Sequence, residues 1–270
     1  MLIDTHAHLN FRVFKEDTDE VIRRSLEGGI WMINVGTQYD TSKKAVEIAE
    51  NYQEGVYAAI GLHPIHSEED FSYEKYKELA KSPKVVAIGE IGLDYKSEYV
   101  LFKEKQKEVF LKQLDLAREL NLPVIFHCRF AHEDLIEILN YKLKTINYKL
   151  KGVIHCFAGT WEQAQKYLEM GFYLGFNGII FKLDLDEIIK KTPLDRILVE
   201  TDCPYLTPPQ VEGRNEPLYV KYVAERIAKI KNRASARSEG RNESEALIEH
   251  VSFEEVAKTT TENAKKLFNI

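Results

Sequence analysis

Short apolar runs rich in β-branched and aromatic residues recur along this chain, and a longer segment with helical periodicity generally follows each of them. This alternation is the pattern of βα units built around parallel strands. The eight predicted strands cover residues 2–5, 31–35, 56–61, 85–90, 123–127, 152–157, 172–176 and 196–201. The clearest predicted helices cover residues 18–27, 41–51, 102–120 and 161–170.

Eight such units in 270 residues are typical of one (β/α)8 TIM barrel, so we expect a single α/β domain over residues 1–270. A doubly wound open sheet is the competing fold, and it usually carries a G-x-G-x-x-G turn after its first strand. The first strand here runs instead into His-Ala-His at residues 6–8. The pattern therefore favours the closed barrel.

One segment departs from this alternation. Residues 232–250 are rich in Ser, Arg and Glu and poor in apolar residues, so we expect a flexible insertion there. It joins two predicted helices, of which the first follows Pro217. The second opens at Ser252, and Glu255 three positions later predicts a capping box.

Charge and cysteine content limit the classes of function. The net charge is −6, so no overall basic field attracts long duplex nucleic acid, and any phosphate binding must be local. Cys128, Cys156 and Cys203 form no C-x-x-C pair, which predicts free thiols in a reducing compartment. We find no signal peptide and no run long enough to span a membrane, and nothing calls for an obligate protein partner. We expect a cytoplasmic protein.

Metal-ligating side chains stand at the ends of the predicted strands, where active sites of this fold are built. They are His6, His8, His63, Glu90, His127, His155 and Asp202. A single histidine at such a position is often a packing residue. Several strand ends carrying a histidine or an acid together predict a functional site.

The spacing of these residues indicates a metal centre. His6 and His8 lie two apart, so both side chains leave the strand on one face and can converge on one ion; Asp4 shares that face, either to orient a ligand or to bond at the strand end. Four imidazoles and two carboxylates supply enough ligands for two divalent ions, and such donors suit zinc, manganese or magnesium. Glu90 can bridge two ions, and Asp202 can accept a proton from the attacking water. No lysine lies within residues 85–93, which disfavours a bridging modified lysine.

These motifs resemble the TatD family of metal-dependent deoxyribonucleases from residue 1 to about 231 and again from 252. The matching motifs are DTHAH at 4–8, GLHP at 61–64, GEIGLD at 89–94, His127 with Arg129, HCF at 155–157, ETD at 200–202 and GRNEP at 213–217. The resemblance implies a TIM barrel of the amidohydrolase type, a divalent-metal requirement and hydrolysis of DNA, in several members from 3′ to 5′. It also implies metal ligands at His6, His8, Glu90, His127, His155 and Asp202.

The chain departs from the family pattern at Phe130, where the family commonly has an acid, and that change puts a substrate contact in doubt. Other substrate contacts are expected near the metal site. Arg129 should face the same side as His127 and offers a guanidinium fork to a phosphate. We expect His63 to donate a hydrogen bond to that phosphate and Tyr205 to stack on a terminal base.

Further residues are expected to be structural. Arg214, Asn215 and Glu216 should fix the loop after the eighth strand, and the cysteines should face the helices. Tyr95 is expected mainly to pack. The histidines outside the motifs are expected at the surface, and they are His66, His132 and His250.

The residues leave the hydrolysed bond open. The main prediction is a deoxyribonuclease that acts on DNA ends or short single strands through water activated by two metals. An amide, lactone or D-aminoacyl-tRNA ester hydrolase would use the same ions, but such a substrate needs no phosphate fork at Arg129. A noncatalytic metal or nucleic-acid binding module is the third possibility, and the presence of every candidate ligand, with the proposed base Asp202, argues against it.

Overall fold

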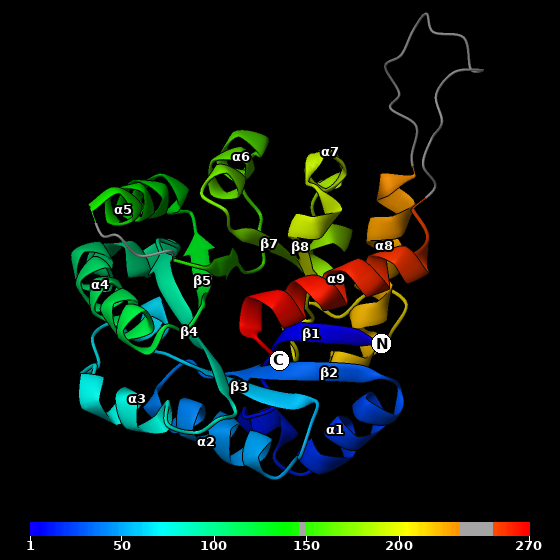
Figure 1. Cartoon of the computed structure of the whole chain (residues 1–270), viewed down its shortest axis with the longest axis horizontal. Coiled ribbons are helices and arrows are strands. Elements are labelled where there is room, and N and C mark those ends of the chain that lie inside the picture. The colour runs from blue at the N-terminus through cyan, green and yellow to red at the C-terminus, as the bar shows by residue number, and fades with distance from the viewer. Residues whose placement is uncertain (146–149, 233–250) are drawn as a thin grey trace, which may run out of the picture.

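The computed structural model describes residues 1–145, 150–232 and 251–270. Eight parallel strands form one sheet in sequential order, from β1 to β8, and the helices alternate with them around a nearly closed barrel (Figure 1). The strands are β1 Leu2–Ala7, β2 Ile30–Val35, β3 Val56–Ile60, β4 Val85–Asp94, β5 Val124–Arg129, β6 Gly152–Ile154, β7 Tyr173–Phe176 and β8 Ile197–Val199. The predicted (β/α)8 fold is confirmed.

The helices follow the predicted amphipathic segments closely. They are α1 Thr18–Glu27, α2 Tyr39–Glu50, α3 Tyr73–Leu79, α4 Lys103–Leu120, α5 His132–Thr145, α6 Trp161–Glu169, α7 Asp186–Lys191, α8 Val220–Lys231 and α9 Phe253–Phe268. Short 3-10 helices are η1 Arg12–Phe14, η2 Pro64–His66, η3 Ser97–Phe102, η4 Gly178–Phe181, η5 Leu194–Arg196 and η6 Pro217–Tyr219. Ser252 caps α9 by accepting from the Glu255 N–H at 3.1 Å, as expected for one half of the capping box. The predicted insertion, apart from Asn232, falls on residues 233–250, which lie outside the described residues.

β4, β6 and β8 differ most in length from the prediction. β4 continues to Asp94, because a Cβ at Gly92 would lie 2.0 Å from the His127 carbonyl oxygen and only glycine allows the approach. β6 and β8 end early, and left-handed residues follow each of them, Cys156 with φ 47° and Asp202 with φ 58°. Both of these left-handed residues line the cavity at this end of the barrel.

The barrel closes between β1 and the segment that follows β8. The Asp202 N–H donates to the His6 carbonyl at 2.8 Å, and the His8 N–H donates to the Cys203 carbonyl at 3.0 Å. Asp4 reinforces this seam, since its carboxylate accepts from the Thr201 N–H at 2.8 Å and from the Thr201 hydroxyl at 2.6 Å. The seam fixes Asp202 beside the two histidines His6 and His8.

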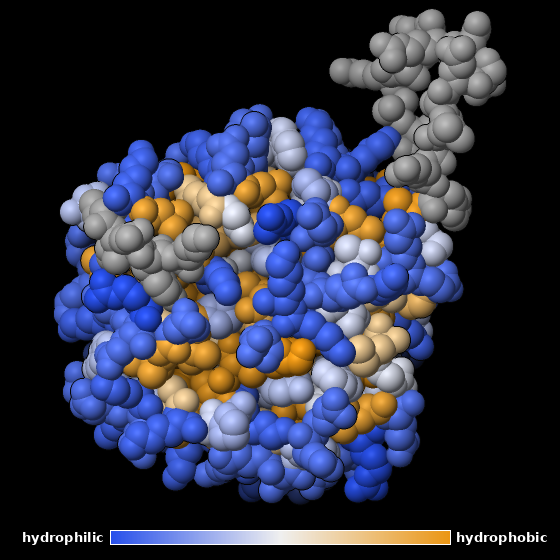
Figure 2. Space-filling model, viewed as in Figure 1, coloured by the Kyte–Doolittle hydropathy of each residue, from blue (hydrophilic) through white to orange (hydrophobic). Residues whose placement is uncertain are grey.

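Helix α9 covers the N-terminal end of the barrel. Phe268 joins the apolar side chains that fill the barrel interior, and the Asn263 amide donates to the Ile197 carbonyl at the start of β8. Both chain termini lie near this helix (Figure 1). The surface in Figure 2, drawn in the same view, is mostly hydrophilic with apolar patches between the charged side chains. Within the described ranges, no helix is long and apolar enough to cross a bilayer.

Candidate active site

The opposite end of the barrel surrounds a cavity of about 1380 Å³. Eight of the nine predicted site residues line it, namely His8, His63, Glu90, His127, Arg129, His155, Asp202 and Tyr205. The ninth, His6, is fully buried beside them. The fold thus gathers side chains from β1, β4 and β5, and from the segments that follow β1, β3, β6 and β8, into one place.

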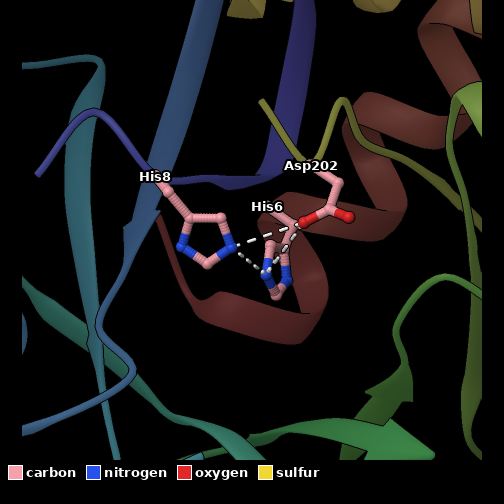
Figure 3. Close-up of side chains that lie close together, drawn as sticks. All are labelled: His6, His8 and Asp202. Carbon is pink, nitrogen blue, oxygen red and sulfur yellow. Dashed lines mark hydrogen bonds and ion pairs between the residues drawn. The ribbon is translucent and has the colours of Figure 1, made fainter. Parts of the chain in front are cut away.

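His6, His8 and Asp202 form one corner of the site (Figure 3). The Nε2 atoms of the two histidines lie 3.2 Å apart, as the spacing of two residues predicted. Asp202 Oδ1 lies 3.3 Å from His8 Nε2 and 3.9 Å from His6 Nε2. Two ring nitrogens and a carboxylate oxygen therefore face one small volume.

Glu90 lies at the centre of the cluster and is 3% exposed. Its Oε1 atom is 2.6 Å from His127 Nδ1 and 3.6 Å from His63 Nε2. Its Oε2 atom is 3.4 Å from His6 Nε2. The ring of His155 stacks on that of His6, with 3.5 Å between the centroids, and His155 Nε2 lies 3.7 Å from Glu90 Oε1. Oε1 thus faces His127, His63 and His155, and Oε2 faces His6.

Oxygen atoms lie beside the outer nitrogens of three of these rings. His8 Nδ1 lies 2.9 Å from the Val35 carbonyl oxygen. His127 Nε2 lies 3.1 Å from Asp94 Oδ2, and His155 Nδ1 lies 2.8 Å from Glu200 Oε1. Hydrogen bonds such as those of His8 and His127 fix which nitrogen faces the centre and raise its basicity, whereas His155 and Glu200 lie close without hydrogen-bond geometry. We assigned no role to Asp94 or Glu200 from the sequence, although both are acids in motifs that carry a predicted ligand.

The charges of the cluster depend on one another. Burial opposes ionisation of Glu90, but His63, His6, His127 and His155 outweigh it and hold the pKa of Glu90 well below its ordinary value. Burial also opposes protonation of His127, yet Glu90 and Asp94 raise its pKa to about 9. At His63, burial and the neighbouring His127 lower the pKa to about 4. An anionic carboxylate thus sits among closely packed imidazoles.

The donor set fits divalent cations. Four groups among the described residues have ligand atoms within 4.8 Å of one another: His6 with His8 and Asp202, His6 with Glu90 and His155, His63 with Glu90 and His127, and His155 with Cys156 and Asp202. Imidazole nitrogens and carboxylate oxygens are the ligands that zinc, manganese and magnesium take in proteins. The Nε2 atoms of His6 and His8 lie 3.2 Å apart, close enough for both to face one shared cation. His63 was expected to touch substrate, and the structure also places its ring among the candidate ligands.

Two predicted substrate residues lie at the rim. Arg129 is exposed, and no hydrogen bond or ion pair of its guanidinium is found among the described residues, so the chain offers it no rim ion pair there. The Tyr205 side chain is 56% exposed. Tyr95 also lines the cavity, and its hydroxyl donates to Asp134 at 2.7 Å.

The structure corrects two predictions about cysteine and histidine. Cys156 was expected to face the helices, but it follows a strand that ends at Ile154, and it lines the cavity beside His155 and Asp202. His132 was expected at the surface. Its side chain is half-buried at the start of α5 and lines the cavity, and its Nδ1 atom lies 3.0 Å from the Tyr167 hydroxyl of α6 and 3.3 Å from Cys128 Sγ.

The remaining cysteines and histidines vary in exposure. Cys128 contacts α6 through Tyr167, Cys203 is fully buried, and all three cysteines are free thiols. His66 is half-buried, and its Nδ1 atom lies 3.2 Å from Glu69 Oε1. His250 lies outside the described residues.

The loop after β8 is held by the residues expected to be structural. Arg214 donates to both oxygens of Asp17, and Glu216 pairs with Arg24 at 2.7 Å. The Asn215 amide donates to the Thr201 carbonyl at 3.0 Å. These bonds tie the loop to the first part of the chain and to the seam that carries Asp202.

A barrel that gathers such a cluster at the C-terminal ends of its strands defines a metal-dependent hydrolase of the TIM-barrel class. Comparison with known proteins gives the family. The family model described as TatD related DNase matches residues 3–269, and this chain belongs to that family.

Full-length relatives agree with this assignment. The chain is 44% identical to an uncharacterized metal-dependent hydrolase, YabD, of Bacillus subtilis, with 100% of both chains covered. It is 35% identical to the 3′-5′ ssDNA/RNA exonuclease TatD of Escherichia fergusonii, covering 100% of this chain and 99% of that one. The solved structure of the TatD homolog YJJV from Escherichia coli superposes with a TM-score of 0.84 at 29% identity, covering 100% of this chain and 98% of the other. The expected enzyme class, a metal-dependent hydrolase, is confirmed.

Proposed function

We propose that this enzyme hydrolyses phosphodiester bonds and removes nucleotides from the 3′ ends of single-stranded DNA. The observation that carries the proposal is the exposed guanidinium of Arg129 at the rim of the cavity that holds the cluster. A planar guanidinium matches the oxygens of a phosphate, and a carboxyl-derived substrate needs no such partner. The exonuclease name of a relative 35% identical over the whole chain supports the same substrate class.

We infer two cation sites that share Glu90. His6, His8 and Asp202 would hold one cation, and His127 and His155 would hold the other, while His63, whose Nδ1 accepts from the Ile65 N–H, keeps a donor at Nε2. The sharing follows from the carboxylate, because Oε2 faces His6 and Oε1 faces His127 and His155. Cations bound there, of zinc, manganese or magnesium, would neutralise phosphate charge and lower the pKa of the attacking water.

Asp202 is the residue we assign as general base. Its side chain is 17% exposed, whereas that of Glu90 is 4% exposed, so solvent reaches Asp202 more readily. A base must lie within hydrogen-bond reach of the proton that it accepts. Asp202 would take that proton from water on the cavity side, while His8 holds its Oδ1 atom.

The cavity suits an oligomeric substrate with a free end. Its volume of about 1380 Å³ exceeds the roughly 300–1,000 Å³ of sites for single small ligands. Arg129 and His63 would contact phosphate oxygens, and Tyr205 would stack on a base. With a net charge of −6, attraction to DNA must come from the site itself, which favours strand ends over long duplexes. A cytoplasmic location belongs to the same proposal.

The test is cleavage of a 5′-labelled single-stranded DNA by protein stripped of metal and resupplied with Mg²⁺, Mn²⁺ or Zn²⁺. We expect stepwise shortening from the 3′ end with at least one ion. Asp202→Asn should lower kcat by at least about 100-fold, since general-base loss typically costs 10²–10⁴. Arg129→Met should lower kcat/KM on DNA more than Arg129→Lys does, and Arg23→Met, on the exposed side of α1, serves as the control.

Two results would point elsewhere. Cleavage of an aminoacyl ester that is unaffected by Arg129→Met, with no cleavage of DNA or RNA, would favour the ester hydrolase. Binding of oligonucleotide with metal and no turnover of any substrate would favour a binding module.

A further inference from the structure

Phe130 combines two features that contribute little to the stability of the fold. Its φ is 55°, in the left-handed region that bulky side chains rarely adopt and that glycine, asparagine and aspartate adopt more readily. Its side chain is 76% exposed, so the ring gains little from burial. Residues held in such conformations cluster at ligand sites.

The position of this ring ties it to the cavity. Phe130 follows Arg129 directly at the end of β5, three residues after His127, and all three line the same cavity. Eight large apolar side chains are exposed in the described part of the chain, and Phe130, Leu183 and Tyr205 are the three that line this cavity. The exposed apolar side chains thus line the same cavity as the Arg129 guanidinium and the candidate metal ligands.

These neighbours define the ligand chemistry. An exposed aromatic ring offers a flat apolar face, and the adjacent guanidinium binds an anion. A ligand that satisfies both carries a planar ring close to a phosphate, as a nucleotide does. Base stacking on aromatic side chains is a general means of holding single strands, because every base has such a face.

We propose that Phe130 stacks on an unpaired base of the strand being hydrolysed and sets the selectivity of the enzyme for single-stranded ends. This inference rests on the proposed nuclease function. A paired base already stacks within its duplex and cannot cover the Phe130 ring without leaving it. The ring therefore selects for frayed or single-stranded ends, and Arg129 positions the neighbouring phosphate.

The test combines variants of Phe130 with substrates that lack single bases. Phe130→Ala keeps a Cβ in the same backbone conformation, so it removes the ring without relieving the left-handed residue. We expect it to raise KM on single-stranded DNA roughly 5- to 100-fold, the range for loss of one base stack, with kcat within about twofold. Phe130→Trp should retain the wild-type KM. Leu101→Ala, which removes a side chain 78% exposed and outside the cavity lining, is the matched control.

A strand with one abasic residue locates the contact. The abasic residue is placed in turn at each of the last four nucleotides. At one of these positions it should raise the KM of the wild type, whereas the KM of Phe130→Ala should not change there. In an Asp202→Asn background, which separates binding from turnover, 2-aminopurine at that position should lose fluorescence on binding. Phe130→Ala should abolish that quenching.

The outcomes separate this inference from the proposed function. If the wild type shortens DNA but Phe130→Ala leaves KM and quenching unchanged, the stacking role is wrong and the nuclease proposal stands. Additive effects of Phe130→Ala and the abasic residue at every position would also contradict the stacking role and leave the nuclease proposal intact. If no ion supports cleavage of DNA or RNA, the nuclease proposal fails and the stacking role fails with it.

Discussion

Individual atoms decide what each histidine of this site can do. His127 presents Nδ1 to Glu90 and turns Nε2 toward Asp94, whereas His8 presents Nε2 and turns Nδ1 toward a main-chain carbonyl. Which ring nitrogen faces the centre is thus set by the partner of the other one. His132 is different, since its Nδ1 atom contacts only a hydroxyl and a thiol among the described residues.

Protonation of His132 should make the fold sensitive to mild acid. Burial lowers the pKa of His132 from 6.5 to about 4, so the folded state favours its neutral form. Stability from this residue is complete above pH 6.5 and is lost as pH falls toward 4, because the unfolded chain binds the proton first. At pH 5 the loss reaches up to about 2 kcal/mol.

The measurement is the free energy of unfolding in urea at pH 7.5 and 5.0, with chelator present. His132→Gln should lose less stability over this interval than the wild type loses. The control is His66→Gln, because His66 is more exposed and pairs with Glu69. Equal losses in wild type and His132→Gln would show that the burial of His132 does not carry the effect.

At the scale of elements, the seam between β1 and the end of β8 connects stability to the site. Asp4 is fully buried and accepts bonds from Thr201 across the seam and from the His6 N–H at 3.2 Å. His6 accepts in turn from the Asp202 N–H at 2.8 Å. One acid thus holds the strand that leads into His6 and His8 against the segment that carries the proposed base.

Asp4→Ala should lower both stability and turnover. It leaves two buried donors of Thr201 without a partner, and each such loss costs about 1–3 kcal/mol. We expect the free energy of unfolding in urea to fall by about 3 kcal/mol. We also expect kcat to fall with little change in KM, because Asp202 loses its support. Asp17→Ala breaks the partly exposed pair with Arg214 and should cost no more than about 1 kcal/mol, with kcat unchanged. Equal effects of the two variants would contradict the seam model.

In the molecule as a whole, the two ends of the barrel have different roles. Helix α9 and the interior apolar cluster close the N-terminal end, whereas the opposite end gathers two carboxylates and several imidazoles. This division is general for the fold, in which one face serves stability and the other serves chemistry. It also means that ligands bound at the second face add to the stability of the entire barrel.

Metal removal should therefore lower the melting temperature of the protein. A ligand that binds only the folded state at 100 times its Kd stabilises that state by about 2.7 kcal/mol. For a chain of this length, that corresponds to a shift on the order of 5–10 °C between chelated and reloaded protein. Glu90→Gln, which weakens the carboxylate shared by the two proposed sites, should reduce the increment. An unchanged melting temperature with every ion would contradict the proposed sites.

The architecture and most of the cluster could be predicted from the amino-acid order. The alternation of apolar runs with amphipathic segments requires a layered α/β fold, and eight such units without the glycine-rich turn of an open doubly wound sheet are typical of a closed barrel. The ends of parallel strands meet at one rim, so histidines and acids at those ends had to converge. The spacing of two between His6 and His8 likewise placed both rings on one face of the first strand.

How those residues meet depends on contacts between segments that are distant along the chain. The contacts of Asp94 and Glu200 with ring nitrogens depend on where β4 and β8 end, and the left-handed conformation of Cys156 after β6 follows from packing rather than from the local preference of cysteine. The turn after β6 brings Cys156 into the cavity, and the approach of α5 to α6 covers part of His132. Side-chain direction at a strand end is set by such neighbours, because the period of two stops where the strand stops.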